Sequence, residues 1–111
     1  MSKGKGEIPR GSLDLLILHT LETMGGLHGY SIARRIEQVA GTMRLSQGSI
    51  YPALIRLEQR GWIRTRWGTS ETNRRVKVYE LTKAGSKRLH VEIANWEQST
   101  ALIAKFLGAR P

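Results

Sequence analysis

The chain has 111 residues, enough for one domain with a modest core, but near the size at which association with a second chain commonly adds stability. It contains no cysteine, which excludes disulfides, thiolate metal sites and cysteine nucleophiles. The apolar run 13–18 is too short for a secretory signal and is interrupted by Asp14, and no apolar stretch approaches the ~20 residues that cross a bilayer. We therefore expect a cytoplasmic protein with no membrane partner.

The net charge of +9 is concentrated in the middle of the chain. Residues 28–79 carry ten lysine and arginine side chains against three glutamates, so this segment contributes +7 of the net charge of +9. Such localised positive charge indicates a polyanionic partner, nucleic acid ahead of a membrane surface. A basic surface selected only for solubility is the alternative that charge alone leaves open.

The first segments read as an arm followed by two helices. Residues 1–9 are polar and rich in glycine and end in proline, so we expect a flexible basic arm. The stretch 11–24 has strongly apolar helical spacing, typical of a core helix or of one shared with a partner chain. Residues 29–39 form a second predicted helix, which directs Arg34 and Arg35 outward.

The third predicted helix, SQGSIYPALIRLEQRG at residues 46–61, contains a proline. Ser46 is a good N-cap residue, but proline inside a helix costs about 3 kcal/mol because it removes a donor and collides with the carbonyl four residues back, here that of Gly48. The cost is small if Pro52 lies in the first turn. We predict a tightened, 3₁₀-like polar turn and then a helix from about residue 49, with the small size of Gly48 reducing crowding against the proline ring.

The periodicity then changes from helical to extended. Residues 62–67 alternate apolar or neutral side chains with arginine, and residues 76–81 are β-branched and aromatic. The polar stretch 68–75 between them contains Asn73 and two arginines. The pattern predicts a β-hairpin with a basic tip.

Thr82 can cap a final helix that begins at Lys83 and runs without proline to about Leu107, roughly 37 Å at 1.5 Å per residue. This helix carries a heptad seam, and a seam of this kind favours self-association. Packing of the seam against the first helix of the same chain is the alternative. The residues that we expect at a dimer interface are Leu16, Leu89, Ile93, Trp96, Thr100, Ile103 and Leu107.

Three helices followed by a hairpin with a basic loop is the order of a winged helix-turn-helix. The predicted fold class is therefore mainly α with a small β-hairpin, extended by a long C-terminal helix. In this fold the third helix enters the major groove by its N-terminal end, where short polar side chains and free backbone N–H groups reach bases and phosphates. The hairpin brings Arg74 and Arg75 to a neighbouring groove or phosphate, supported by Lys77.

Three segments resemble the PadR family of bacterial transcriptional regulators: HGYSIARRIE at 28–37, GSIYPALIRLEQRGWI at 48–63 and RRVKVYELTKAG at 74–85. The resemblance covers roughly residues 11–107 and implies a homodimeric winged-helix DNA-binding protein, usually a repressor, of the compact branch with a single C-terminal helix. One departure is Val78-Tyr79, where many relatives have two aromatic residues. The expected organisation is an arm over 1–9, a winged-helix domain over 10–82 and a dimerisation helix over 83–108.

By position, the resemblance and the predicted elements assign DNA contacts to nine residues: Tyr30, Ser46, Gln47, Ser49, Tyr51, Arg56, Arg74, Arg75 and Lys77. Tyr30 and Tyr51 could instead be half-buried core aromatics. Gln47 and Ser49 could be helix-capping groups. Arg34, Arg35 and Arg44 would make non-specific phosphate contacts, which position the protein rather than specify the sequence.

The resemblance also implies that some compact members bind planar or hydrophobic molecules between two subunits. Trp96 lies in the middle of the heptad seam, where two indoles across a two-fold axis could stack on a flat aromatic effector. The alternative is a large residue of the dimer core.

We expect neither an enzyme nor a bound cofactor. The three histidines lie on separate predicted elements, and the sequence has no phosphate-loop or dinucleotide glycine pattern. Two other classes share the charge: a small basic RNA-binding protein and an interaction module that binds an acidic protein. The first should prefer structured RNA over duplex DNA, and the second should show no salt-dependent binding of nucleic acid.

Overall fold

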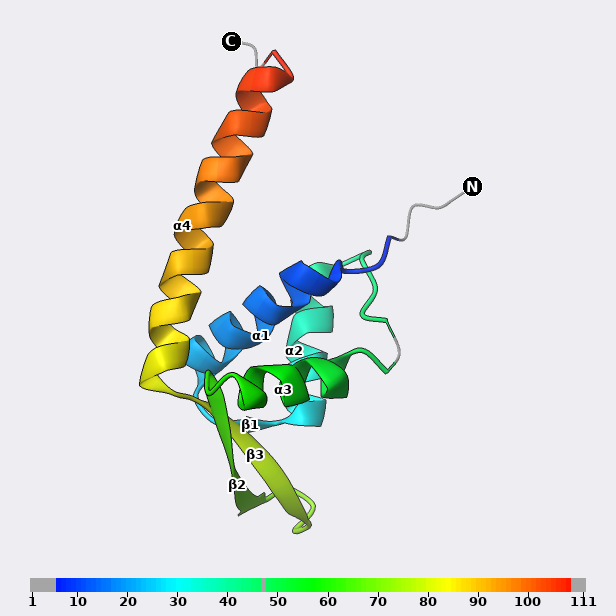
Figure 1. Ribbon diagram of the computed structural model, residues 1–111. Coiled ribbons are helices and arrows are strands. Elements are labelled where there is room, and N and C mark those ends of the chain that lie inside the picture. Colours follow the sequence, from blue (N-terminus) through cyan, green and yellow to red (C-terminus); the bar gives the residue numbers. More distant parts are fainter. Residues whose placement is uncertain (1–5, 47, 109–111) are drawn as a thin grey trace.

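The computed structural model describes residues 6–46 and 48–108. Three helices, α1 (Arg10–Met24), α2 (Gly29–Ala40) and α3 (Ile50–Gln59), precede the hairpin of β2 (Ile63–Thr69) and β3 (Arg75–Leu81). A long helix, α4 (Lys83–Phe106), follows the hairpin (Figure 1). The predicted class is confirmed: mainly α with a small β-hairpin in winged-helix order, extended by a C-terminal helix.

One strand is absent from the sequence prediction. The two-residue β1 (Leu27–His28) pairs antiparallel with β3, which gives a three-stranded sheet in the order β1-β3-β2. Two residues are too few to show alternation, so the sequence carries no strand signal there. The pairing fixes the start of α2 beside the hairpin.

The core lies where the three helices meet the base of the hairpin and the first turns of α4. Its fully buried side chains come from five elements. They are Ile17, Leu18, Ile32, Leu54, Leu57, Ile63 and Leu89.

Residues 6–9 do not form part of a free arm, contrary to the expectation for 1–9. The amide of Ile8 donates to the carbonyl of Arg44 at 2.9 Å, and the amide of Arg44 donates to the carbonyl of Gly6 at 2.9 Å. Ile8 itself is buried in the core cluster. The backbone hydrogen bonds tie the segment to the α2–α3 connection, and the buried Ile8 side chain anchors it to the core. Residues 1–5 lie outside the described range.

The start of α3 confirms the predicted position of the proline. The amide of Ser49 donates to the carbonyl of Ser46 at 3.0 Å, which closes a tight turn, and α3 begins at Ile50. Pro52 is therefore in the first turn, where its missing N–H costs little. Ser46 is not the N-cap: that position belongs to Ser49, whose hydroxyl donates to the Ser46 carbonyl at 2.7 Å.

The prediction that the small size of Gly48 relieves crowding against Pro52 is wrong. A Cβ at this position would meet no atom within 4 Å, so there is no crowding against the proline ring to relieve. The backbone has φ +81° instead, a left-handed conformation that glycine adopts without steric cost. The turn before α3 thus needs glycine for its backbone angle.

The hairpin from Ile63 to Leu81, called the wing below, is in continuous antiparallel register from Ile63↔Leu81 to Thr69↔Arg75. Its turn is closed by the Ser70 amide, which donates to the Arg74 carbonyl at 2.8 Å. Asn73 has φ 63°, which asparagine tolerates better than most residues. The strands extend further toward the tip than predicted, so Arg75 belongs to β3.

The first turns of α4 belong to the body of the protein. The Thr82 hydroxyl accepts from the Gly85 amide at 3.0 Å, as predicted for a cap. Gly85 packs against the backbone of Trp62 so closely that a Cβ would lie 1.9 Å from the Trp62 carbonyl oxygen. Glu22 of α1 accepts a hydrogen bond from Ser86 at 3.0 Å and lies 3.2 Å from His90 Nε2.

Leu89 corrects the predicted dimer seam. Its side chain is fully buried in the core of its own chain, so it is not available to a partner. Ile93, one turn later, is partly buried against the same core. The expected alternative, packing on α1, thus holds for the base of α4, whereas the helix beyond Ile93 extends away from the body (Figure 1).

Candidate nucleic-acid interface

The start of α3 exposes short polar groups beside an aromatic ring. Ser46 and Ser49 are partly exposed and Tyr51 is 52% exposed, so Tyr51 is not the core aromatic that the sequence left possible. The tyrosine ring lies over Gly29, where a Cβ would come within 2.8 Å of it. Glycine at this position therefore lets the first turns of α2 and α3 approach each other. Gln47 lies outside the described residues.

The start of α2 presents a second exposed tyrosine. Tyr30 is 63% exposed, and its ring stacks on that of His28 with 6.3 Å between centroids. Arg34 lies one turn later, with its guanidinium carbon 5.9 Å from the ring centroid and Nη1 3.4 Å from the phenol oxygen. The hydrogen bond to Tyr30 raises the pKa of Arg34. The start of α2 thus combines an aromatic surface with a fixed positive charge.

A groove of about 770 Å³ runs between α2 and the tip of the wing. It was not foreseen from the sequence, because its walls come from segments more than 30 residues apart and no local pattern relates them. Hydroxyl and basic groups dominate its lining, which suits phosphate oxygens. On the α2 side these groups come from His28, directly before the helix, and from Tyr30, Ser31, Arg34 and Arg35. At the wing tip, Thr69, Ser70 and Thr72 contribute hydroxyl groups.

The inner face of the wing, defined here by Thr65, Trp67, Thr69, Arg75 and Lys77, is the side that faces α3. Directly paired residues in an antiparallel ladder share a face, and the register pairs Thr65 with Tyr79, Trp67 with Lys77 and Thr69 with Arg75. Thr65 donates to Glu58 of α3 at 3.2 Å. Tyr79 is buried in the core beneath it, and burial raises its pKa.

The outer face of the wing, defined by Arg64, Arg66 and Glu80, is electrostatically compensated. Arg66 Nε donates to one Glu80 oxygen at 2.6 Å and Arg64 Nε to the other at 3.3 Å. These hydrogen bonds, that of Arg66 above all, lower the pKa of Glu80. No comparable carboxylate pairs with Arg74, Arg75 or Lys77 among the residues that the structure describes.

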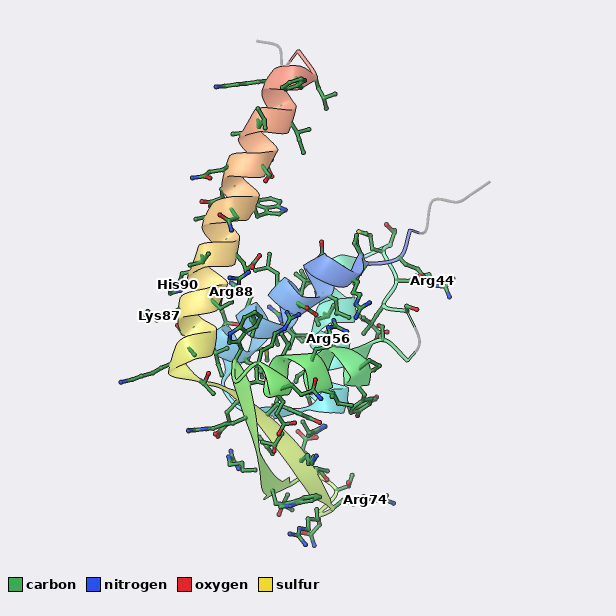
Figure 2. All side chains as sticks on the ribbon, in the orientation of Figure 1. Arg44, Arg56, Arg74, Lys87, Arg88 and His90 are labelled. Atoms are coloured by element: carbon green, nitrogen blue, oxygen red, sulfur yellow. The ribbon has the colours of Figure 1, made fainter. Side chains whose placement is uncertain are left out.

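Arg56 does not belong with the exposed basic groups. Its Nη2 donates to Asp14 Oδ1 of α1 at 2.6 Å, and both side chains are 21% exposed. In Figure 2, Arg56 lies between α3 and α1, whereas Arg74 lies at the far end of the wing. The two partners of this helix–helix ion pair are 42 residues apart in sequence, so no local pattern reveals it. Because the pair gives Arg56 a structural role, we leave this residue out of the proposed DNA interface.

The C-terminal half of α4 exposes the rest of the predicted seam. Trp96 is 58% exposed, Ile103 56% and Phe106 84%, and Thr100 and Leu107 are exposed as well. Leu16 of α1 is partly buried and lines an apolar groove of about 390 Å³ between α1 and α2. Val39 and Met43 are exposed large apolar side chains of that groove. Two uncovered apolar surfaces therefore exist on one chain.

Within the described ranges, no group of three or more histidine, aspartate or glutamate side chains is placed to hold a metal ion. Over the same residues, no helix is long and apolar enough to span a membrane.

The family model described as "Transcriptional regulator PadR-like family" matches residues 17–91, more than half of the chain. A curated protein of Streptomyces fradiae, "Uncharacterized 37.1 kDa protein in transposon TN4556", is 44% identical over 68 residues, which are 61% of this chain. The match covers 18% of that protein, so the chain spans less than a fifth of its length.

Solved structures match over nearly the whole chain. A transcriptional regulator from Clostridium thermocellum is 32% identical with a TM-score of 0.77, covering 87% of this chain and 91% of its own. A PadR family transcription regulator from Clostridium difficile R20291 is 30% identical with a TM-score of 0.77, covering 88% of this chain and 100% of its own.

Proposed function

Because the chain belongs to the PadR-like family of transcriptional regulators, which are not enzymes, we propose that it is a homodimeric repressor that binds a pseudo-palindromic site in duplex DNA. The observation that carries this proposal is the close approach of three exposed regions: the hydroxyl groups at the start of α3, the tyrosine and arginine at the start of α2, and the unpaired basic groups of the wing. Tyr51 over Gly29 joins the two helix starts, and the groove joins α2 to the wing tip.

On this surface, the start of α3 reads base edges in the major groove. Ser46, Ser49 and Tyr51 supply hydroxyl groups there, and Gln47 supplies an amide; such groups pair with base edges and phosphates. Tyr30 lies beside them on α2. Arg74, Arg75 and Lys77 bind a neighbouring groove or its phosphates, which positions the protein and makes binding depend on salt.

A second copy of the chain covers the bare half of α4. Isolated helices with an apolar stripe gain little stability until the stripe is buried against another surface. The groove lined by Leu16 on α1 and the stripe of Trp96, Thr100, Ile103 and Leu107 are both uncovered in one chain. A two-fold axis near these surfaces would place two wings on half-sites about one helical turn, roughly 34 Å, apart.

Trp96 also supports a regulatory role for a flat aromatic effector. Its exposed indole lies on the part of α4 that we assign to the dimer, where two symmetry-related rings could hold a planar ligand between them. Fluorescence titration with flat cationic and phenolic compounds tests this role. Quenching in the wild type that disappears in Trp96→Leu supports it, and no quenching across the panel refutes it.

The primary test combines sedimentation equilibrium with a salt-titrated gel-shift assay. We expect a dimer, and an affinity for duplex DNA that falls steeply with salt because bound phosphates release counterions. Tighter binding of structured RNA than of duplex DNA would favour the RNA-binding alternative. Binding that does not depend on salt would contradict the proposed interface. Genome-wide selection of bound fragments would then identify the operator.

A further inference from the structure

Trp67 is a large aromatic side chain in an exposed part of the hairpin. It is 56% exposed, and it lies outside the core cluster that buries Ile63 and Tyr79 at the base of the same face. A solvent-exposed tryptophan contributes little to a core, since its apolar area remains in contact with water. Its exposure therefore indicates that the indole binds another molecule rather than packing in the core of its own chain.

The indole organises the positive charge of the inner face. The guanidinium carbon of Arg75 lies 4.4 Å from the centroid of the Trp67 ring, within the range of a cation–π contact. Lys77 pairs directly with Trp67 across the ladder. One aromatic ring thus holds one cation and has a second basic residue on the neighbouring strand, and a stacked guanidinium keeps its N–H donors free for an acceptor.

Comparison of the two wing faces shows that this arrangement is confined to one of them. On the outer face, both Arg64 and Arg66 donate to Glu80. On the inner face, no described carboxylate lies within 4.0 Å of Arg75 or Lys77. Unpaired cations around an exposed ring, on the side continuous with α3, are the composition expected of a surface that binds a polyanion.

We propose that Trp67 is a DNA-contacting residue, which packs its exposed edge against deoxyribose in the minor groove while it holds Arg75 over its other surface to reach the groove floor. This assignment rests on the proposed function. The minor groove is about 6 Å wide and carries a negative potential that attracts arginine. Apolar side chains that accompany arginine in this groove pack against sugars or base steps.

The test uses two defined probes, duplex poly(dI-dC) and duplex poly(dG-dC). They differ by the guanine 2-amino group, which projects only into the minor groove. Wild-type protein should bind poly(dI-dC) more tightly. Trp67→Ala should weaken binding to poly(dI-dC) about tenfold and bring the affinities for the two polymers close together. Arg75→Ala should lose the same preference, with little further loss in the double variant.

Trp62→Phe is the matched control. Trp62 also contacts arginine, with the Arg60 guanidinium carbon 5.2 Å from its ring centroid, but it lies at the base of the hairpin against α4. This variant should retain the affinity and the polymer preference. Trp67→Phe gives an independent readout: bound DNA should protect tryptophan fluorescence from acrylamide in the wild type and in Trp62→Phe, and this protection should be reduced in Trp67→Phe.

The outcomes separate the two proposals. Wild-type protein without salt-dependent binding of either polymer contradicts the proposed function itself. If wild-type protein binds but Trp67→Ala keeps both its affinity and its preference, the DNA contact of Trp67 is refuted and the proposed function stands. Equal weakening on both polymers with a lowered melting temperature would assign Trp67 to hairpin stability alone, and it would also overturn the inference.

Discussion

Two parts of this protein project from one body in opposite directions, and they are uncovered for different reasons. The wing extends one way and the C-terminal half of α4 the other (Figure 1). The wing carries five basic side chains against two glutamates. The bare half of α4 instead exposes large apolar side chains, among them Trp96, Ile103 and Phe106. Unpaired charge indicates a polyanionic partner, whereas an unpaired apolar stripe indicates another apolar surface.

The comparison separates stability from function within one short chain. The residues that hold the fold together, such as Leu54 and Leu89, lie between the two projections and are fully buried. The wing cations that we assign to DNA have no carboxylate partner among the described residues. The apolar side chains of α4 that we assign to a second copy are exposed to solvent. If this division is correct, changes at either projection should alter binding far more than folding.

The largest effect is expected from Ile103→Glu, which places a charge in the apolar stripe. A buried unpaired carboxylate is costly, so the variant should sediment as a monomer. Loss of two-site binding should weaken DNA affinity about 100-fold. Sedimentation and gel-shift assays measure the two effects. Gln98→Glu adds the same charge on the opposite side of α4 and should remain dimeric; an unchanged dimer in Ile103→Glu would exclude the stripe from the interface.

A smaller effect is expected from the wing. Arg74→Ala combined with Arg75→Ala should weaken binding at least about tenfold on all duplex sequences and reduce the salt slope by about two, since about one counterion is released for each neutralised phosphate. The charge-matched control is Arg64→Ala with Arg66→Ala on the outer face, where Glu80 already compensates part of the charge. Equal slopes for both double variants would show that the two faces do not differ.

The Arg56–Asp14 pair should affect folding and leave DNA binding unchanged. Arg56→Met should lower the free energy of unfolding by about 1–2 kcal/mol, because the partly buried carboxylate loses a charged hydrogen-bond partner. Urea denaturation measures this loss, and Asp14→Asn should give a similar value with a smaller than additive double variant. A reduced salt slope of DNA binding in Arg56→Met would show that Arg56 contacts DNA phosphates and would contradict this assignment.

The smallest effect is expected at Glu80 on the exposed outer face. Its lowered pKa means that the ionised carboxylate is favoured in the folded state, so its stabilisation is present above the ordinary carboxyl pKa of 4.5 and is lost as the pH falls through the lowered value. The melting temperature of wild-type protein should exceed that of Glu80→Gln at neutral pH, and the difference should disappear in acid and shrink in high salt. A difference that grows toward acid pH would contradict the ion pair.

Local signals in the sequence determined the four helices and the hairpin. Pro52 in the first turn of α3 and the Thr82 cap of α4 follow from the chemistry of a few neighbouring residues. The exposure of Tyr30 and Tyr51 also agrees with one of the two interpretations left open for each. These features could be predicted because the interactions that set them span one or two turns.

Tertiary structure alone decided which groups are left unpaired. Leu89 has the spacing of a seam residue, but it is buried because α4 starts against the body of its own chain. The sequence predicts Arg56 as an exposed basic residue of the third helix, but it forms an ion pair with Asp14, which lies 42 residues earlier. Trp67 and Arg75 meet only through the strand register. A residue's partner depends on distances in space between segments that the chain separates, and the periodicity of each segment contains no information about them.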